Sequence, residues 1–530
     1  MGKQNEKRTI MQKQEDSVFK KLLTPSRIIP LSFLAVILAG TLLLMIPAAT
    51  AEGEHTSFLT ALFTSTTSVC VTGLVVVDTF RHWTLFGKAV ILVLIQIGGL
   101  GVISVISIFP LLTGRRFSLR ERILVHDALG VDSFRGLMKY LRSVSIGTFA
   151  VEGAGALVYA IAFVPRFGLA RGIWYGIFHS ISAFCNAGID ILGPDSLIPW
   201  NSQPLVLINT MVLIVLGGLG YVVWFNIARS CRRPAHRVWG EIAKVRCGRR
   251  GNETAAESAA GRARSGRSAA GRDFGTDSSG RAAGAAQGTG TNGSGFSIWQ
   301  LDQRSLSEHT KLVLILTAVL IFGGAVLVYL AESGNPDTLG GMPFGQRVLN
   351  SIFQSVTFRT AGFASVPQNR LTDTSVLLGC MLMFIGGSPT GTAGGVKTVT
   401  MFLVLLSILS YVRGQRQALV FRRSVTAEMR EKAATIVAYN ALVTFVLLVL
   451  LLVLSPSVSL TDGLYEMCSA TATVGLSRGI TSTLTAGGRI VVILAMFMGR
   501  TAPISMAVFF LSGRGEKNGI RYATGRFIVG

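Results

Sequence analysis

Charged residues are scarce in this sequence, and acidic residues are the scarcest. Only 15% of the 530 residues are charged, and 27 acidic residues stand against 50 basic ones. So low a charged fraction excludes the usual composition of a water-soluble globular protein. The six cysteines are scattered, at positions 70, 185, 231, 247, 380 and 468. This spacing predicts neither a disulfide framework nor a CxxC metal site.

Clusters of catalytic or metal-binding residues are also lacking. The six histidines have no metal-ligand spacing, and no nucleophile stands beside a candidate base. The stretch GTAGGVKT at 391–398 is close to a P-loop, but Val396 replaces the glycine that must precede the lysine. It also lies inside an apolar run rather than after a soluble strand. We therefore expect no enzyme and no resident cofactor.

Long apolar runs are abundant, since half of the residues are hydrophobic. A helix that crosses a membrane needs about 20 apolar residues. Eight runs meet this need, at 28–49, 85–112, 143–164, 205–228, 311–330, 375–410, 433–454 and 490–511. The run 375–410 is too long for one simple helix and is interrupted by glycines, so we expect two half-helices joined by an irregular loop.

Four further apolar segments are far too short to cross a membrane, at 58–68, 173–184, 348–357 and 464–472. Each ends in a polar loop, which is typical of a re-entrant half-helix. Irregular backbone at membrane depth is tolerated only where it is buried in protein or lines a wet cavity. We therefore expect these four loops to lie together inside the protein.

The four loops share one pattern: a small or hydroxyl residue, a few mixed positions, one glycine and an apolar residue. They read VCVTGL, FCNAGI, FRTAGF and ATVGLS, and their glycines are separated by 115, 174 and 113 residues. A second glycine follows each of them after 24–29 residues, at positions 98, 217, 386 and 499. Two markers in the same phase predict a unit of helix, half-helix, loop and helix that occurs four times.

The predicted fold is therefore an all-α integral membrane protein with four tandem repeats around a central pore, eight spanning helices and four re-entrant half-helices. The repeats are 25–112, 140–228, 310–411 and 432–512. The tails 1–24 and 513–530 and the connections between repeats are basic, so the positive-inside rule places them in the cytoplasm. The insert 229–309 is rich in Gly, Ala, Ser and Arg, and we expect most of it to be disordered. We assign the excess of positive charge to orientation and to membrane lipids rather than to nucleic acid.

The loops predict a cation pore. A half-helix presents its partially negative C-terminal end to the cavity, and rings of backbone carbonyls can replace the water shell of a cation. The glycine is needed where a Cβ would obstruct the chain. We call these segments filter loops 1 to 4, and their predicted lining residues are Val71, Thr72, Gly73, Asn186, Ala187, Gly188, Thr360, Ala361, Gly362, Thr473, Val474 and Gly475.

These loops and the eight spans resemble the Trk/Ktr/HKT superfamily of potassium transporters, and the KtrB-type membrane subunit in particular. The resemblance covers nearly all of the chain outside 230–305. In that superfamily a serine in place of the first filter glycine accompanies sodium permeability, so Gly73 favours potassium. The resemblance also implies a homodimer, one pore in each protomer, a cytoplasmic RCK-type nucleotide-binding ring as regulator, and stimulation by sodium. It implies residence in the bacterial plasma (inner) membrane.

The interruption at 386–396 matches the intramembrane gate of that superfamily, and we call it the gate loop. An arginine at membrane depth should face the cavity or loop carbonyls. We interpret Arg500 as an electrostatic barrier that holds the gate loop closed, with a purely structural pairing as the alternative. The predicted gate residues are Gly386, Gly387, Ser388, Thr390, Gly391, Thr392, Gly394, Gly395, Lys397 and Arg500.

Two alternatives to a potassium channel subunit stay open, and a third is disfavoured. The first is a sodium-conducting or cation-coupled member of the same superfamily. The second is a membrane receptor, scaffold or enzyme, which would need a polar catalytic cluster at one membrane depth. A voltage-gated four-domain channel is disfavoured, because no span carries arginine at every third position.

Overall fold

The structure is a computed structural model that describes residues 25–101, 137–230, 306–415 and 417–501. The predicted tails 1–24 and 513–530 and most of the predicted disordered insert 229–309 lie outside these residues. So do the ends of the predicted spans 85–112 and 490–511. The chain divides into two compact units, Met1–Val223 with Glu308–Gly530, and Trp224–Ser307. All elements named below belong to the first unit.

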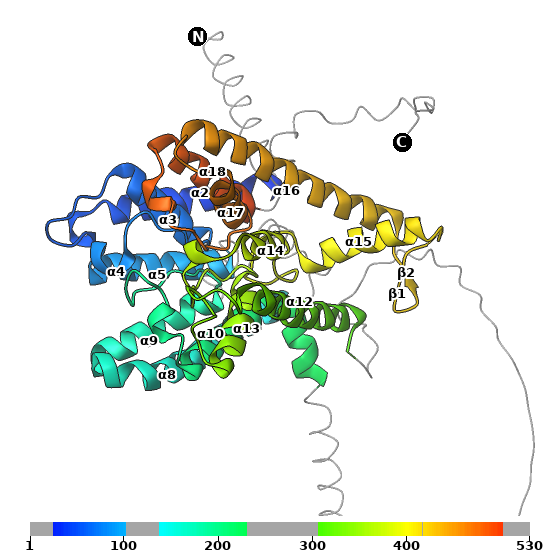
Figure 1. Cartoon of the computed structure of the whole chain (residues 1–530), viewed down its shortest axis with the longest axis horizontal. Coiled ribbons are helices and arrows are strands. Elements are labelled where there is room, and N and C mark those ends of the chain that lie inside the picture. Colours follow the sequence, from blue (N-terminus) through cyan, green and yellow to red (C-terminus); the bar gives the residue numbers. More distant parts are fainter. Residues whose placement is uncertain (1–24, 102–136, 231–305, 416, 502–530) are drawn as a thin grey trace, which may run out of the picture. The chain divides into compact units, whose positions relative to one another are not determined.

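Helices dominate the described part of this unit, in four sets that follow the chain (Figure 1). The first set is α2 (Pro25–Leu44), η1 (Pro47–Ala49), α3 (Phe58–Val69), α4 (Thr79–His82) and α5 (Leu85–Leu100). The second is α8 (Leu137–Phe167), α9 (Leu169–Phe184), η2 (Ile198–Trp200) and α10 (Pro204–Leu219). Polar residues fix several helix starts: Ser57 and Thr84 accept hydrogen bonds from the first turns of α3 and α5.

The third set is α12 (Glu308–Glu332), α13 (Phe344–Thr357), η3 (Gln368–Arg370), α14 (Asp373–Phe384) and α15 (Thr398–Val412). The fourth is α16 (Ala427–Leu454), α17 (Leu460–Thr471), η4 (Thr481–Thr483) and α18 (Ala486–Arg500). The break between α14 and α15 falls where the glycine-rich interruption predicts it. Short helices α3, α9, α13 and α17 stand at the four predicted half-helix positions.

The expectation of an all-α chain is wrong in one detail. Strands β1 (Leu419–Val420) and β2 (Arg423–Ser424) pair in antiparallel fashion within the predicted basic connection after α15. The two residues between them, Phe421 and Arg422, both have positive φ, at 47° and 68°. Two left-handed residues in a two-residue turn match the twist of a hairpin, although neither is the Gly, Asn or Asp that usually indicates one.

Within the part of the chain that the structure describes, long apolar helices are fewer than the eight predicted spans, and two of those spans run beyond that part. Among the described residues, three helices are long and apolar enough to cross a membrane, at Leu141–Phe167, Glu308–Glu332 and Ala427–Leu454. Shorter apolar helices include Leu85–Leu100, Asp373–Phe384 and Thr398–Val412. The first of these ends where the described residues end, and the other two flank the gate loop.

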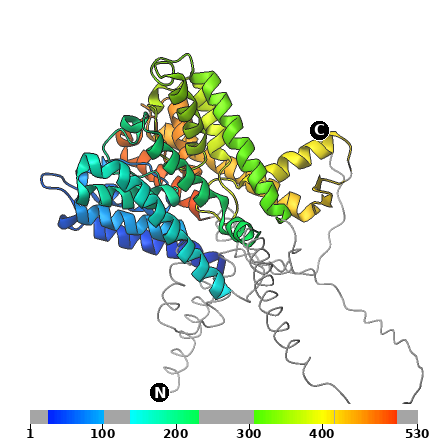
Figure 2. The ribbon, with the colours of Figure 1, turned by 90° about the horizontal axis from the view of Figure 1, so that it is seen from below.

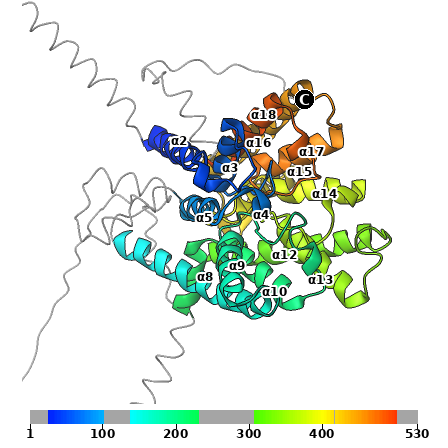
Figure 3. The same cartoon turned by 90° about the vertical axis from the view of Figure 1, so that its left-hand side faces the viewer.

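The four sets close into a ring. The helix that follows each predicted filter loop packs against the short helix of the next set: α5 against α9, α10 against α13, α14 against α17, and α18 against α3. Figure 3 shows the sets in chain order around a middle region of loops. Two helices of the third and fourth sets, α15 and α16, also pack side by side and lead into the β1–β2 hairpin at one edge (Figures 1 and 2).

The buried core consists mainly of the short helices and the loops that follow them. In α3, nine of the ten residues from Thr60 to Val69 are buried. The long helices instead carry exposed apolar side chains, such as Leu157 (71% exposed), Ile161 (68%) and Leu330 (67%). An apolar outer surface around a partly polar interior suits a lipid environment rather than water.

Candidate functional site

Each short helix leads directly into a filter loop with unusual backbone geometry. The first and last lining residues of every loop have positive φ, whereas the middle residue does not. Alternation of this kind turns successive carbonyl oxygens toward the same side of the chain. The φ values are 56° and 103° for Val71 and Gly73, 60° and 64° for Asn186 and Gly188, 66° and 84° for Thr360 and Gly362, and 51° and 98° for Thr473 and Gly475.

The four filter glycines meet one another in chain order. A Cβ built on Gly73 would lie 2.5 Å from the carbonyl oxygen of Ala187, and one on Gly188 would lie 2.7 Å from that of Ala361. The same relationship joins Gly362 to Val474, at 2.6 Å.

The ring closes between the last loop and the first. A Cβ on Gly475 would overlap the carbonyl oxygen of Thr72. Each glycine therefore lies against the middle carbonyl of the next loop, and no other residue fits there.

Hydroxyl groups hold the loops from behind in two matching pairs. In loops 1 and 4, the backbone N–H of the filter glycine donates to Thr67 Oγ1 or Ser469 Oγ, both at 3.0 Å. In loops 2 and 3, Ser182 and Thr357 donate to the carbonyl that follows the glycine, both at 2.6 Å. The sequence signal for these anchors is the recurrent small or hydroxyl residue ahead of each glycine.

A cavity of about 360 Å³ opens on one side of the glycine ring. All four filter glycines line it, together with the carboxyl-bearing residues Asp78 and Asp190. The sequence places these two acids only in a connection, and gives no signal that they reach the loops. The cavity joins the ring to acidic groups, so it favours cations over anions.

Buried carboxylates lie behind loops 2 and 4. Glu152 is 4% exposed and accepts from the side-chain amide of Gln96, at 3.1 and 3.2 Å to its two oxygens. Glu466 is fully buried and accepts from the hydroxyls of Ser477 and Thr481. Both carboxylates accept hydrogen bonds from neighbouring side chains, as carboxylates that stabilise a fold do. Among the described residues, no cluster of His, Cys, Asp or Glu could hold a metal ion.

The gate loop lies between α14 and α15 and is held by backbone hydrogen bonds to α10. Ser388 N donates to Gly218 O at 2.9 Å, and Thr392 N donates to Gly217 O at 3.1 Å. The hydroxyl of Thr392 contacts filter loop 2 through Phe184 O, at 3.1 Å, and Asn186 Oδ1, at 3.2 Å. The loop also approaches filter loop 4, because a Cβ on Gly394 would lie 2.5 Å from Ala472 O.

The other predicted gate residues also lie in or beside this segment. Gly386 and Gly395 pack against each other, while Gly387 and Gly391 lie near Gly218. Thr390 adopts a positive φ of 63°.

The glycines that follow the filter loops after 24–29 residues are Gly98, Gly217, Gly386 and Gly499. In three of the four, the same close contact explains why the residue is glycine. A Cβ on Gly98, Gly217 or Gly499 would overlap the last carbonyl of α3, α9 or α17, respectively. Gly386 differs, since it lies against Gly394 of the gate loop. The repeated spacing therefore indicates close approach of a helix to the preceding half-helix, except where the gate loop intervenes.

Two basic residues bind the gate loop through its carbonyls. Arg500, at the end of α18, donates from Nη1 to Thr392 O at 2.5 Å and from Nη2 to Gly98 O at 2.6 Å. Lys397 donates from Nζ to Ala393 O at 2.6 Å. Arg500 thus joins the fourth, first and third sets of helices at one point.

Comparison with known proteins places the chain in a family. The sequence model of the TrkH family, described as "Cation transport protein", matches residues 6–237 and 305–517. The chain is 31% identical to the potassium/sodium uptake protein NtpJ of Enterococcus hirae, over 96% of this chain and 97% of that protein. It is 30% identical to the Ktr system potassium uptake protein B of Bacillus subtilis, over 98% and 99% of the two chains.

A solved structure has the same fold. The crystal structure of the potassium transporter TrkH from Vibrio parahaemolyticus superposes with a TM-score of 0.60 at 14% identity, over 90% of this chain and 84% of that one. The resemblance to the Trk/Ktr proteins that the filter motifs indicate is confirmed. The chain belongs to the TrkH family of cation transport proteins and is a multi-pass membrane transporter, not an enzyme.

Proposed function

We propose that the chain is a potassium uptake subunit that conducts K⁺ through the ring of filter loops 1 to 4. The observation that carries this proposal is the contact of each filter glycine with the middle carbonyl of the next loop. Four loops in that arrangement bring carbonyl oxygens from four directions to one axis. Such oxygens can replace the water shell of a monovalent cation. Both relatives named above are potassium uptake proteins by name.

The charges around the ring support a cation as the transported ion. The short helices α3, α9, α13 and α17 end at the loops, so their partially negative C-terminal ends adjoin the pore. Asp78 and Asp190 add negative charge to the cavity beside the glycines. No lining residue predicted for the filter loops is an Asp or Glu, which argues against a carboxylate ring for divalent ions.

We assign the gate to the gate loop, residues 386–396, together with Lys397, and the barrier to Arg500. Arg500 holds Thr392 by one hydrogen bond, so its positive charge stands beside the segment that must move when the gate opens. Charge-assisted hydrogen bonds of this kind stabilise one arrangement by about 1.5–3 kcal/mol each. The closed arrangement is therefore favoured until another interaction offsets these bonds.

Regulation comes from outside this chain in our proposal. The sequence carries no P-loop, so an RCK-type nucleotide-binding ring on the cytoplasmic side would supply the control, and Na⁺ would act as a stimulator. A homodimer with one pore in each protomer, cytoplasmic termini and a bacterial inner-membrane location complete the proposal. The Bacillus subtilis relative is named as part of a Ktr system, which agrees with a subunit that works with others.

One observation favours a second candidate function. The Enterococcus hirae relative is named a potassium/sodium uptake protein. A chain that conducts Na⁺ as well as K⁺, or that couples the two, is therefore the alternative.

Cation flux through purified protein in liposomes tests the proposal. We expect K⁺ and Rb⁺ flux above that of empty liposomes and a much smaller Na⁺ flux. Equal K⁺ and Na⁺ flux would support the second candidate instead. No flux, even with a cytoplasmic nucleotide-binding partner added, would contradict both.

A further inference from the structure

Two glutamines join the two ends of filter loop 3. Gln354 lies on α13, before the loop, and Gln368 begins η3, after the loop. Nε2 of Gln354 donates to Oε1 of Gln368 at 2.8 Å, and Nε2 of Gln368 donates to Oε1 of Gln354 at 3.2 Å. The two side chains are only 1% and 6% exposed. This reciprocal pair of buried hydrogen bonds fixes where the chain enters the loop relative to where it leaves.

The fourth set of helices reaches the same amide. Tyr465 of α17 is fully buried and donates its hydroxyl to Oε1 of Gln368 at 2.8 Å. Arg478, which follows filter loop 4, donates from Nη1 to the backbone carbonyl of Gln368 at 3.5 Å and from Nε to Asp462 of α17 at 2.6 Å. Gln368 therefore joins filter loop 3 to the helix that ends at filter loop 4.

Filter loop 4 is closed by side chains in a similar way. Thr481 in η4 and Ser477 both donate their hydroxyls to the carboxylate of Glu466 on α17. Gln368 and Thr481 each stand six positions after the filter glycine of their own loop. Both loops are thus tied back to the helix before them, and the bond from Tyr465 connects the two ties.

The two connected loops are neighbours in the ring of carbonyls. A Cβ on Gly362 would lie 2.6 Å from the carbonyl oxygen of Val474. Gln368 also lines the cavity of about 360 Å³ beside the filter glycines. A displacement of Gln368 would therefore change how loops 3 and 4 lie relative to each other.

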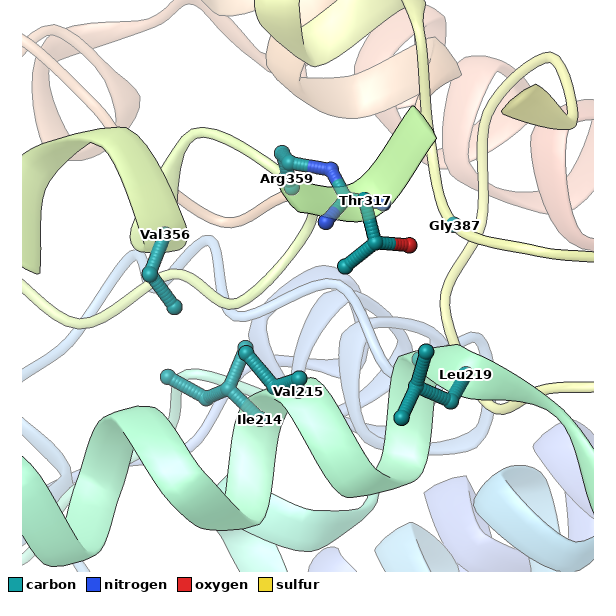
Figure 4. A pocket seen from close by; sticks show the side chains of 8 residues that line it. Ile214, Val215, Leu219, Thr317, Val356, Arg359 and Gly387 are labelled. Atoms are coloured by element: carbon teal, nitrogen blue, oxygen red, sulfur yellow. The ribbon is translucent and has the colours of Figure 1, made fainter. Parts of the chain in front are cut away.

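The other buried polar side chain of filter loop 3, Arg359, does not share this role. The sequence predicts that it braces the loop from behind. It lines a cavity of only about 10 Å³ with Val356, with Thr317 of α12 and with residues of α10 (Figure 4). Its Nε has no hydrogen-bond partner among the residues that the structure describes.

We propose that Gln368 is a positioning residue for ion selection, which holds filter loops 3 and 4 at the separation at which their carbonyl oxygens fit K⁺. The inference rests on the proposed potassium transport. Na⁺ is smaller than K⁺, so the ring must contract before its carbonyls coordinate Na⁺ equally well. Side chains that hold neighbouring loops at a fixed separation oppose this contraction.

Tyr465→Phe is the smallest change that tests the inference, because it removes only the hydroxyl that links α17 to Gln368. The measurement is the ratio of Na⁺ to K⁺ flux through the purified full-length protein in liposomes. We expect this ratio to rise about threefold, the effect of one lost hydrogen bond. Gln368→Met loses every side-chain bond of the amide at similar size, so its ratio should rise about tenfold.

Tyr159→Phe is the matched control. Tyr159 is 1% exposed, and its hydroxyl bonds with that of Thr210 at 2.6 Å, which joins α8 to α10 within the second set. Each tyrosine variant loses one buried hydrogen bond, so both should lower the melting temperature in detergent by a similar amount. Tyr159→Phe should nevertheless keep the wild-type flux ratio.

The outcomes separate this inference from the proposed transport. A wild-type ratio in Tyr465→Phe and Gln368→Met, with K⁺ flux retained, would overturn the inference and leave the transport proposal intact. An equal rise in Tyr159→Phe would also overturn it, because the change would then follow from lost stability. Should Gln368→Met fail to fold, the two tyrosine variants still decide. Absence of K⁺ flux in the wild type would contradict the proposed function itself, and the inference with it.

Discussion

The guanidinium of Arg500 donates a hydrogen bond of 2.5 Å to the carbonyl oxygen of Thr392, 108 positions earlier in the chain. The same group donates a second bond, of 2.6 Å, to Gly98 of α5. One side chain from the last described helix therefore ties the gate loop to the first set of helices. Release of the gate loop must break the bond to Thr392.

Arg500→Gln should raise basal K⁺ flux. Loss of charge-assisted hydrogen bonds worth about 1.5–3 kcal/mol each should increase the open population roughly ten- to a hundredfold, as long as the closed state dominates in the wild type. Flux from liposomes in the absence of any cytoplasmic partner measures this change.

Arg489→Gln is the matched control for that prediction. Arg489 lies on the same helix but bonds to the carbonyl of Ser482, away from the gate loop. Its variant should keep the basal flux of the wild type. Unchanged flux in Arg500→Gln, with and without partner, would exclude the barrier role and leave a structural pairing.

Glu332→Gln should destabilise the fold without acting on the pore. Its carboxylate is 1% exposed and accepts from Thr338 Oγ1 at 2.6 Å, Asn335 Nδ2 at 2.7 Å, and both N and Oγ1 of Thr372, at 2.9 and 2.7 Å. In glutamine an amide nitrogen replaces one carboxylate oxygen. That nitrogen is a donor, so it would face the N–H and O–H donors that the oxygen of Glu332 accepts from. We expect a loss of about 2 kcal/mol, seen as a lower melting temperature in detergent.

The exposed carboxylate of Asp337 gives the comparison for Glu332. It forms a 3.9 Å ion pair with Arg370, and both side chains are more than half exposed. Asp337→Asn should change the melting temperature little, because exposed ion pairs contribute little. Equal effects of the two substitutions would show that the Glu332 network does not hold this corner of the fold.

Transport should depend on external pH through Asp190, which lies in the connection between α9 and α10 and lines the cavity beside the filter glycines. Burial raises the pKa of this carboxyl from 3.8 to about 7, and the charges of Asp78 and Asp195 add to the rise, while hydrogen bonds from Ser196 and Leu192 oppose it. The group is therefore mostly neutral at pH 6 and mostly charged at pH 8.

Cation flux at low K⁺ should accordingly increase between pH 6 and 8. One added charge near the ion changes its energy by about 1 kcal/mol or less in a water-filled cavity, so the increase should be roughly fivefold at most. Asp190→Asn should remove the dependence, and Asp195→Asn should keep it. A wild-type profile that is flat over this range would contradict the role of Asp190.

The position of the glycines and the length of the apolar runs predict much of the helical arrangement. The break between α14 and α15 follows from five glycines in one apolar run, and the short helices follow from runs of half the spanning length. The apolar runs do not predict where helices start, because capping residues lie outside the runs. The helix α16 begins at Ala427 since Thr426 accepts from Met429 N, several residues before the apolar run at 433.

The contacts between neighbouring filter loops cannot be predicted from a pattern in the sequence. Repetition alone groups the four filter glycines, but it does not reveal that Gly73 lies against Ala187 and Gly475 against Thr72. The carbonyl partners of Arg500 carry no residue-specific signal, because every residue has a carbonyl.

Selectivity of Gly73→Ser is the most direct test of the carbonyl ring. Gly73 has a φ of 103°, and a Cβ would lie 2.5 Å from the carbonyl oxygen of Ala187. Gly53 also has a positive φ, 84°, but nothing lies within 4 Å of a Cβ there, so Gly53→Ser is the control. The measurement is the ratio of Na⁺ to K⁺ flux through each purified variant in liposomes.

The ring account predicts low Na⁺ flux in the wild type and in Gly53→Ser. In Gly73→Ser the ratio should rise about tenfold or more, which corresponds to roughly 1.4 kcal/mol of lost discrimination. A Gly73→Ser variant that keeps the wild-type ratio while still conducting K⁺ would contradict the claim that these carbonyls select the ion.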